Sequence, residues 1–573
     1  MSYLFLCSIG PVQDFIAAAR SSRDLAYGSW LLSELAKTAA RTIAEQEGFE
    51  ALIFPTPASR DDLRPNSNLS VANKVVAVVR GNPQTLAKSV EEALRRHIRQ
   101  VWQSVEDRLG RDLDTTLARR QLEDLIEFYW VAVPFEGEEG YTAARDLGEA
   151  ALNARKATRN FVPYQGVSRF KSSIDGWREH VLALVPDHAS RPNAQQMRRY
   201  KLRNGELLSG VDLLKRWGDL PTVKRYKSVS HIAALPFAEG VGEKADELWE
   251  ALVNLFRKEE ISSFADDYSV FFPAEVCAVF DDKEKTRKVL QAQEDILTQY
   301  AGHKRPSPYY ALLLADGDSM GKAIDAQKTP DAHRKLSQAL SAFAQQVPDI
   351  VEKHKGVPVY AGGDDVLAYL PLHTALNCVR ELADTFATTM KNFVFEDERG
   401  NKHPPTLSAG LVITHHLEPL RDVLNLVRSA EKQAKAVAGK NALAITLNKR
   451  SGTDRTVKDT LSRLVERLNT MAQWWLDGTL SKGTAYELEY LAREMKNILQ
   501  KEDDVLPEDA LRAEAIRILK RKRESGGGEQ VTQTVIQQLE EWLKQIALGD
   551  LAQEMIIANE FARAYKQAQP KQV

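Results

Sequence analysis

Acidic residues follow runs of apolar residues at two places in the chain, where a buried strand would not normally carry them. One is Ala311-Leu312-Leu313-Leu314-Ala315 followed by Asp316-Gly317-Asp318, and the other is Gly362-Gly363-Asp364-Asp365 between two strand-forming runs. A Gly-Gly pair in such a setting favours a β-hairpin, and glycine also lets a ligand approach the backbone. If these strand ends converge, their carboxylates suit a magnesium site for nucleotide phosphates, because Mg²⁺ combines a few carboxylates with water and phosphate oxygens.

Each motif alone has a simpler interpretation, a calcium loop for Asp316-Gly317-Asp318 and a solvated turn for Gly362-Gly363-Asp364-Asp365. The calcium interpretation is weak, because Met320-Gly321-Lys322-Ala323-Ile324 looks helical and supplies no series of oxygen ligands after Asp318. The two motifs are separated by one helix-length segment, which favours a shared site for Asp316, Asp364 and Asp365. Asp318 is either a further ligand or a cap of the helix that follows.

Downstream segments complete a regular order of elements. Pro405 to Ile413 and Ala442 to Leu447 are strands by composition, and the segment between them predicts a helix that ends in Ala434-Lys435-Ala436-Val437-Ala438-Gly439-Lys440-Asn441. The order is strand, helix, hairpin, helix, strand, helix, strand, which resembles the palm domain of GGDEF and class III nucleotidyl cyclases. The Ser-Ala-Gly strand at Ser408 and the turn around Lys440 belong to the same resemblance. The chain departs from it at Asp365, where GGDEF cyclases carry Glu, and no Phe follows.

The N-terminal part predicts the same order of elements without the hairpin. Its expected strands and helices are Tyr3 to Ile9, a long helix from Val12 to Glu45, Ala51 to Phe54, Val71 to Val79, a helix from Thr85 to Leu109, and Phe128 to Val133. We therefore expect a duplicated palm, in which one copy has lost its metal ligands.

Short motifs in the N-terminal half make the resemblance specific. They resemble the large palm-domain subunit of type III CRISPR effector complexes, in its Cmr (III-B) branch. The matching residues are Ile9-Gly10-Pro11-Val12-Gln13, Phe15-Ile16, Ala19-Arg20, Arg23-Asp24-Leu25, Gly28-Ser29, Leu32-Ser33, Arg203-Asn204-Gly205-Glu206-Leu207, Lys215-Arg216 and Ser228-Val229-Ser230-His231-Ile232-Ala233.

A chain of 573 residues is too long for one core. The expected fold class is α+β multidomain, with two ferredoxin-like, cyclase-type palms and two helical domains. The predicted boundaries are 1–160 for a first palm without metal ligands, 161–300 for a mostly helical middle domain, 301–452 for the second palm and 453–573 for a helical C-terminal domain.

Two departures from the family narrow the expected activity. Many relatives carry an N-terminal HD nuclease domain, but this chain contains no His-Asp dipeptide. We therefore expect no HD domain and no DNase activity. Relatives also often carry a four-cysteine zinc site, and no cysteine lies near Phe170 to Gly176, where such a site would begin. No zinc is expected.

The resemblance implies an RNA-activated enzyme that joins ATP molecules into cyclic oligoadenylates by two-metal nucleotidyl transfer. Asp316, Asp364 and Asp365 would be catalytic and, together with Asp318, would hold Mg²⁺ or Mn²⁺. Its partners would be the other subunits of the complex, a guide RNA and a target RNA. The residues expected to bind nucleotide are Gly317, Gly362, Gly363, Ser408, Lys435, Lys440, Ser8 and Gln13.

Simpler interpretations of several of these residues stay open. Lys435 and Lys440 could be solvated lysines at a helix end, where the dipole favours positive charge. Ser8 and Gln13 could only shape a tight turn between a strand and a helix. The run Lys520-Arg521-Lys522-Arg523 could touch RNA, but a solvated helix end is the better interpretation.

Composition excludes several classes of protein. The net charge of −2 excludes a broadly basic protein, so any RNA contact must come from local patches or from partner subunits. No run approaches the roughly 18–20 apolar residues of a membrane span, and the first residues do not form a signal peptide. The three scattered cysteines are typical of a reducing cytoplasm.

Three functions remain open from the sequence. The first is a target-RNA-activated oligoadenylate synthase. The second is a catalytically idle scaffold subunit of the same ribonucleoprotein, which the retained carboxylates argue against. The third is a stand-alone nucleotide cyclase, which the N-terminal motifs and the large helical parts argue against.

Overall fold

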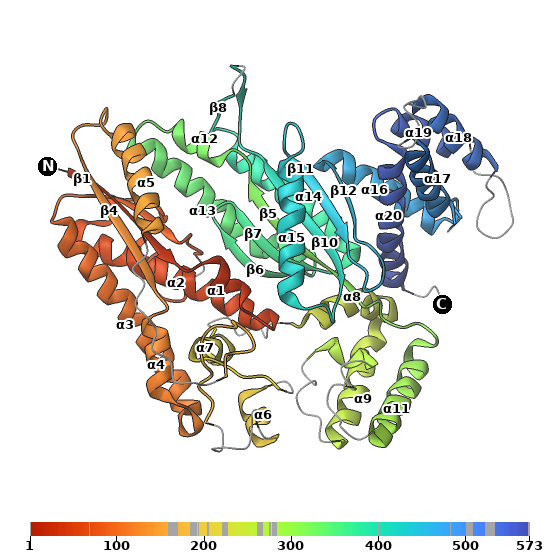
Figure 1. Ribbon diagram of the computed structural model, residues 1–573, viewed down its shortest axis with the longest axis horizontal. Helices are drawn as coiled ribbons and strands as arrows, with labels where there is room; N and C mark the ends of the chain where they lie inside the picture. Colours follow the sequence, from red (N-terminus) through yellow and green to blue (C-terminus); the bar gives the residue numbers. More distant parts are fainter. Residues whose placement is uncertain are drawn as a thin grey trace.

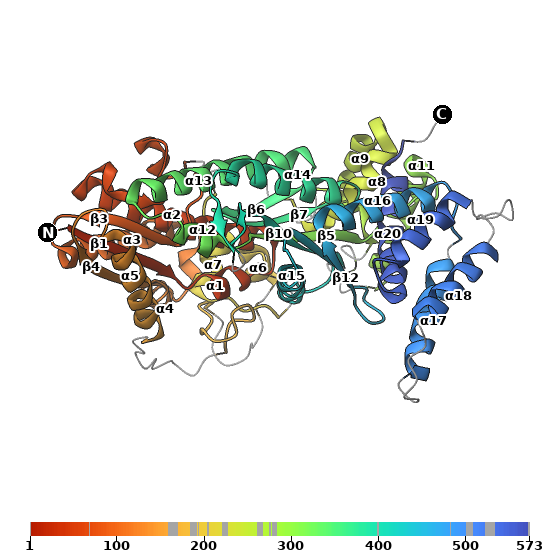
Figure 2. The same ribbon diagram turned by 90° about the horizontal axis from the view of Figure 1, so that it is seen from above.

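The computed structural model of the protein describes residues 2–67, 69–158, 170–183, 192, 194–202, 205–220, 227–259, 267–273, 277, 283–397, 400–481, 483–499, 508–521 and 533–570. Two β-sheets with their helices lie beside each other along the long axis of the molecule, and the C-terminal helices lie beyond the second sheet (Figures 1 and 2).

The first sheet is formed by apolar strands of the N-terminal part, in the spatial order β2-β3-β1-β4 with every neighbouring pair antiparallel. Alternate residues of β1 face opposite sides of the sheet. Phe5 and Cys7 pack toward α2 and α3, whereas Leu4 and Leu6 pack toward α5. The elements are β1 Ser2–Gly10, α1 Gln13–Ala17, α2 Ser22–Glu47, the 3-10 helix η1 Phe49–Ala51, β2 Leu52–Phe54, η2 Arg60–Leu63, β3 Lys74–Val79, α3 Pro83–Leu109, η3 Gly110–Asp112, α4 Thr115–Glu123, β4 Glu127–Phe135 and α5 Tyr141–Ala157.

The expected long helix from Val12 to Glu45 is wrong in one respect, because the chain forms two helices there. α1 ends at Ala17, and α2 begins at Ser22. Ser21 between them is extended, and its side chain accepts a hydrogen bond from the backbone N–H of Asp24. A serine in this position is a favourable N-cap, so it starts a new helix rather than continuing the old one.

The second sheet has the spatial order β12-β11-β10-β5-β7-β6. Its part β10-β5-β7-β6 repeats the arrangement of β4-β1-β3-β2, and the chain order strand, helix, strand, strand, helix, strand is also the same. Helices α13 and α14 cover one face, and α15 and α8 cover the other. The elements are β5 Tyr309–Gly317, α12 Met320–Asp325, α13 Pro330–Lys353, β6 Val357–Gly362, β7 Asp365–Leu370, α14 Leu372–Met390, β8 Phe395–Glu396, β9 Lys402–His403, β10 Leu407–His415, α15 Leu420–Lys435, β11 Ala442–Leu447 and β12 Arg455–Thr460.

The remaining helices do not form separate bodies. α7 joins the core of the first sheet, α8, α9 and α11 join the core on one face of the second sheet, and the C-terminal helices join the core on its other face. β12 lies in the segment that was expected to be helical, and it pairs with β11. The domain boundaries stay predictions. The elements are α6 Ala194–Tyr200, α7 Gly210–Trp217, α8 Val229–Val241, η4 Gly242–Lys244, α9 Ala245–Lys258, η5 Tyr268–Phe271, α11 Lys283–Ala301, α16 Leu461–Leu476, α17 Thr484–Leu499, α18 Glu508–Arg521, α19 Gln533–Leu543 and α20 Leu548–Ala568.

None of the helices in the described ranges combines the length and the apolar character that crossing a bilayer requires.

Candidate active site

The two acidic motifs meet at Gly317, the last residue of β5. A Cβ atom on this glycine would lie 2.8 Å from both Cβ and Oδ2 of Asp364 and 2.7 Å from Cγ of Met320. Such distances are shorter than real Cβ contacts, so only glycine fits here. Asp316 is the residue before Gly317, and it pairs with Ser408 of β10. The structure therefore brings the β5 motif and the hairpin motif together, as the sequence predicted.

The predicted hairpin is present, but its carboxylates are placed differently from the expectation. Only Gly363 and Asp364 lie between β6 and β7, and Gly363 has the positive φ of 70° that a glycine tolerates. Asp365 is already the first residue of β7 and pairs with Gly362. The two carboxylates are half-buried rather than displayed at a solvated tip. The hairpin thus holds both side chains against the body of the palm.

Burial and mutual repulsion make these carboxylates hard to ionise. Burial raises the pKa of Asp364 to about 6. Burial, Asp364 and Glu431 together raise the pKa of Asp365 to about 7. Glu431 of α15 has a raised pKa itself, because it is buried and lies near Asp318. A bound cation would offset this repulsion, so the group is electrostatically suited to one.

Glu431 is the site residue that sequence reasoning missed. It lies one helical turn before Lys435, and its Oε1 is 3.2 Å from Nζ of Lys435. The spacing of four residues between a glutamate and a predicted site lysine was the available signal.

Lys435 lies at the C-terminal end of α15 and forms an ion pair with Asp316. Its ammonium is therefore the nearest positive charge to the carboxylates. Lys440 also points toward the site, because Gly439, Lys440 and Asn441 all have positive φ and turn the chain back. Nζ of Lys440 lies 3.3 Å from Oγ of Ser319, next to the end of β5. Both lysines thus lie beside the end of β5, and their contact with a triphosphate stays a prediction.

Asp318 is a buried residue next to the site that links neighbouring segments by hydrogen bonds. Its side chain is only 2% exposed, and Oδ2 accepts hydrogen bonds from the hydroxyls of Thr406 and Ser408 and from the backbone N–H of Asn441, at 2.7, 2.8 and 3.1 Å. The alternative that Asp318 caps the next helix is wrong, since the N-cap of α12 is Ser319 and makes no side-chain cap bond. Asp318 instead joins β5 to β10 and to the turn before β11.

The Ser408 hydroxyl and Oδ1 of Asp318 differ in whether they have further hydrogen-bond partners. Ser408 is fully buried, and its hydroxyl also accepts from the backbone N–H of Ala442 at 3.2 Å. Oδ1 of Asp318 is buried and has no hydrogen-bond partner among the described residues. The structure therefore shows Ser408 as a support of Asp318, and its contact with a nucleotide stays a prediction.

The acidic side chains at the end of β5 fit a hard divalent cation for which the protein supplies only some of the ligands. Across the ranges that the structure describes, no three or more His, Cys, Asp or Glu side chains are grouped so that they could hold a metal ion. Asp316 precedes Gly317 in β5, and Asp364 lies against Gly317, so two acidic residues come to the end of this strand. Mg²⁺ and Mn²⁺ accept this number of protein oxygens when water and phosphate complete the shell.

Ser8 and Gln13 belong to the first palm. Ser8 is buried in β1, and Gln13 is the exposed first residue of α1. Ile16 and Ala17 of α1 and Tyr360 of β6 border the same apolar cluster, and α2, which follows α1, packs against β6. The roles of Ser8 and Gln13 in nucleotide binding stay predictions.

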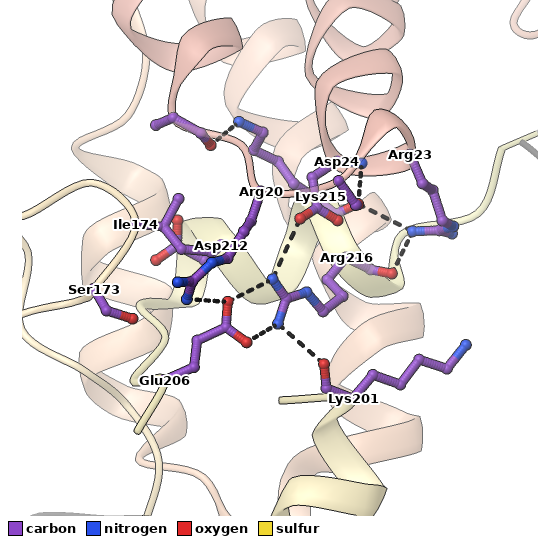
Figure 3. A network of polar contacts seen from close by, with 12 residues as sticks. Arg20, Arg23, Asp24, Ser173, Ile174, Lys201, Glu206, Asp212, Lys215 and Arg216 are labelled. Atoms are coloured by element: carbon purple, nitrogen blue, oxygen red, sulfur yellow. Dashed lines mark hydrogen bonds and ion pairs between the residues drawn. The ribbon is translucent and has the colours of Figure 1, made fainter. Parts of the chain in front are cut away.

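Several residues of the N-terminal motifs form a charged network between α7 and the start of α2 (Figure 3). Glu206 accepts from both terminal nitrogens of Arg216, at 2.8 and 3.0 Å, and Arg216 also reaches Asp24 at 3.3 Å. The fully buried Lys215 donates to the carbonyl oxygen of Phe15 at 2.6 Å, and burial lowers its pKa to about 8. These charged residues therefore hold α7 against α1 and α2.

Some residues of the sequence motifs lie outside the described residues. They are Arg203, Asn204, Lys522 and Arg523.

Two family models match the two palms. Residues 309–444 match the second palm domain of Cas10/Cmr2, and residues 4–106 match the N-terminal domain of the CRISPR-associated protein Cmr2. Both parts of the chain therefore match domains of the Cas10/Cmr2 family. The first model covers the Asp316 and Gly-Gly-Asp-Asp motifs, and the second covers β1 to α3.

Known relatives agree with this assignment. The chain is 27% identical to the CRISPR system Cmr subunit Cmr2 of Pyrococcus furiosus, over 78% of this chain and 62% of that protein. It is 34% identical to the corresponding subunit of Saccharolobus solfataricus, over 20% of this chain and 12% of that protein. The chain thus spans less than two thirds of the length of these members of the Cas10/Cmr2 family.

Solved structures show the same fold. Chains of the type III-B Cmr-beta assembly, in its apo state and bound to cognate target RNA, align with a TM-score of 0.64 and 15% identity. The alignments cover 98% of this chain and 82% and 83% of those chains.

Proposed function

We propose that this protein is the palm-domain subunit of a type III CRISPR effector complex and converts ATP into cyclic oligoadenylates when target RNA is bound. The approach of Asp364 to Gly317, beside Asp316, carries this proposal, since a folded scaffold needs no such cluster of repelling carboxylates. The matches to the Cas10/Cmr2 family support the complex, its RNAs and a cytoplasmic location.

In the proposed reaction the 3′-hydroxyl of one ATP attacks the α-phosphate of another. A new phosphodiester bond forms, the bond from the α-phosphorus to the β-phosphate oxygen breaks, and pyrophosphate leaves with the hydroxyl proton passing to solvent. Asp316 and Asp364 would hold Mg²⁺ or Mn²⁺, with Asp365 beside them. When bound, the cation supplies charge neutralisation and lowers the pKa of the hydroxyl.

The chain's own residues would orient the triphosphate. Lys435 and Lys440 approach the carboxylates from the other side of the β5 end, and their ammonium groups suit phosphate oxygens. The space beside Gly363 is open, so its backbone would be accessible to a nucleotide, whereas Asp364 and Tyr360 fill the space beside Gly317 and Gly362. Asp318 and Ser408 would keep the β5 turn in place beneath it.

The test is the double variant Asp364→Ala with Asp365→Ala in the assembled complex, with ATP, Mg²⁺ and matched target RNA. We expect oligoadenylate formation, measured by mass spectrometry, to fall at least about 100-fold, as for loss of a metal-binding shell. Assembly should be unchanged, because the hairpin contributes little to the core. Asp384→Ala, an exposed carboxylate on α14, is the matched control and should retain activity.

Each alternative function predicts a different outcome. An idle scaffold would assemble with RNA but form no product in the wild-type complex. A stand-alone cyclase would turn over ATP at the same rate without partners or target RNA. Near-normal product yield from the folded double variant would refute the assignment of the site.

A further inference from the structure

Helix α5 of the first palm packs against the second palm as well as against its own sheet. Tyr141 is fully buried, and its hydroxyl lies 2.6 Å from Nδ1 of His333 in α13. A second buried contact joins the first palm to α13, because the backbone N–H of Thr56 donates to Oγ of Ser337 at 2.8 Å. The two palms are therefore joined by buried polar contacts that fix their relative position.

Arg145 extends this contact to α12. Its side chain is 3% exposed. Its guanidinium donates to the carbonyl oxygens of Ile324 and Gln327, at 2.9 and 3.3 Å, and to Oδ1 of Asp325 at 3.0 Å. These acceptors lie at the C-terminal end of α12, where carbonyls lack partners within the helix and the dipole favours positive charge. Arg145 therefore caps α12 from the other palm.

The N-terminal end of α12 lies at the candidate active site. Met320, its first residue, is the side chain that a Cβ on Gly317 would meet at 2.7 Å. Ser319, which precedes it, has a φ of 59° and offers no side-chain cap. A helix of six residues, about 9 Å long, is not stable by itself, so its place depends on what holds its two ends.

We propose that Arg145 is a positioning residue of the oligoadenylate site, through which the first palm holds α12 and thereby the end of β5 that carries Asp316 and Gly317. This inference rests on the proposed function. It gives the first palm, which lacks an acidic residue at the position of Asp316, a defined part in the reaction. A shift of one palm relative to the other would move the capped end of α12 and change the geometry of the carboxylates.

The experiment compares Arg145→Met with Arg155→Met in the full chain and in the assembled complex. Arg155 is on the same helix, but it stacks on Tyr129 and donates to Thr158, so it does not contact α12. For Arg145→Met we expect faster hydrogen exchange in α12. We also expect the Mn²⁺ concentration for half-saturation in the presence of ATP to rise at least about 10-fold, measured by electron paramagnetic resonance. The kcat for oligoadenylates should fall about 10-fold with little change in KM for ATP. Arg155→Met should match the wild type in all of these.

Arg145→Lys provides a second variant if the first does not fold, because it keeps the charge but not the fork that reaches both the carbonyls and Asp325. It should show the same changes at smaller size. Unchanged α12 exchange and unchanged Mn²⁺ half-saturation in a folded Arg145 variant would overturn the proposal. Failure of the proposed function is distinguishable, since the wild-type complex would then form no product while the exchange of α12 would still report on Arg145.

Discussion

The two palms share one frame and differ in two connections. β1 and β5 are both nine residues long and both end in glycine, so Gly10 corresponds to Gly317 and Ile9 corresponds to Asp316. β6 and β7 are joined by Gly363 and Asp364 alone, whereas residues 55–73 join β2 to β3. The first palm thus has neither the strand-end carboxylate nor the tight turn that would present a second one.

This difference shows that the sheet does not determine the chemistry. Both sheets have the same strand order and similar apolar faces, but only the second brings an acidic residue of a tight hairpin, Asp364, against the end of its first strand. Burial there raises the pKa of Asp364 and Asp365, which costs stability that only a function requiring the acids would retain. The first palm instead supplies contacts to α12 and α13.

The largest effect expected from this comparison comes from alanine at the two corresponding glycines. Gly317→Ala should lower oligoadenylate formation at least about 100-fold, because its Cβ would displace Asp364 and Met320, and a misplacement of about 1 Å is enough for such a loss. Gly10→Ala should cost less than about 10-fold, since its Cβ would lie 3.4 Å from the flexible carboxylate of Glu127. Initial rates and apparent Tm values of both variants provide the measurement.

Equal losses of activity at the two positions would break the comparison. They would mean that the end of β1 is as closely fitted to the reaction as the end of β5.

Much of the second palm could be predicted from the sequence, because its signals are local. The Gly-Gly hairpin, the strand at Ala442 to Leu447 and the turn that brings back Lys440 each follow from residue types within a few positions. The convergence of Asp316 and Asp364 could be expected from their places at strand ends. The break at Ser21 and the strand β12 were not predicted, since helix and strand signals there are weak or interrupted.

Contacts between distant segments could not be predicted. The hydrogen bonds of Asp318 to β10 and the cap of α12 by Arg145 depend on how elements pack, and sequence patterns do not show packing. The same applies to Lys215 and Arg216. Their motif was recognised as a resemblance, but only the structure shows that they join α7 to α1 and α2.

The second prediction concerns the charge that balances the carboxylates in the second palm. Lys435→Met should have two effects of opposite sign. It should raise the ATP concentration for half-maximal rate about 10-fold, because a phosphate contact of 1.4 kcal/mol is lost. It should also tighten the binding of Mn²⁺ in the absence of nucleotide, because Lys435 no longer competes for Asp316. Isothermal titration and steady-state kinetics measure the two.

Lys440→Met is the matched control for this prediction. Lys440 contacts Ser319 rather than a carboxylate, so its loss should weaken ATP binding without tightening Mn²⁺. If Mn²⁺ binds equally well to the wild type and to Lys435→Met, the ion pair of Lys435 with Asp316 does not limit access of the cation. In the first palm, Ile9 stands at the position of Asp316, and this uncharged residue needs no lysine to balance it.

The smallest effect concerns the contact between the palms. Burial, Arg145 and Lys74 lower the pKa of His333 to about 4, against about 6.5 in an unfolded chain. Since the folded state disfavours the protonated imidazole, this contribution to stability is complete above pH 6.5 and is lost as the pH falls toward 4. The expected loss is about 2–4 kcal/mol. His333→Gln keeps a polar partner for Tyr141 and should flatten the fall of apparent Tm across this window. His403→Gln, at an exposed histidine of β9, should leave the profile of the wild type unchanged, and parallel profiles for His333→Gln and the wild type would show that the contact between the palms does not respond to pH.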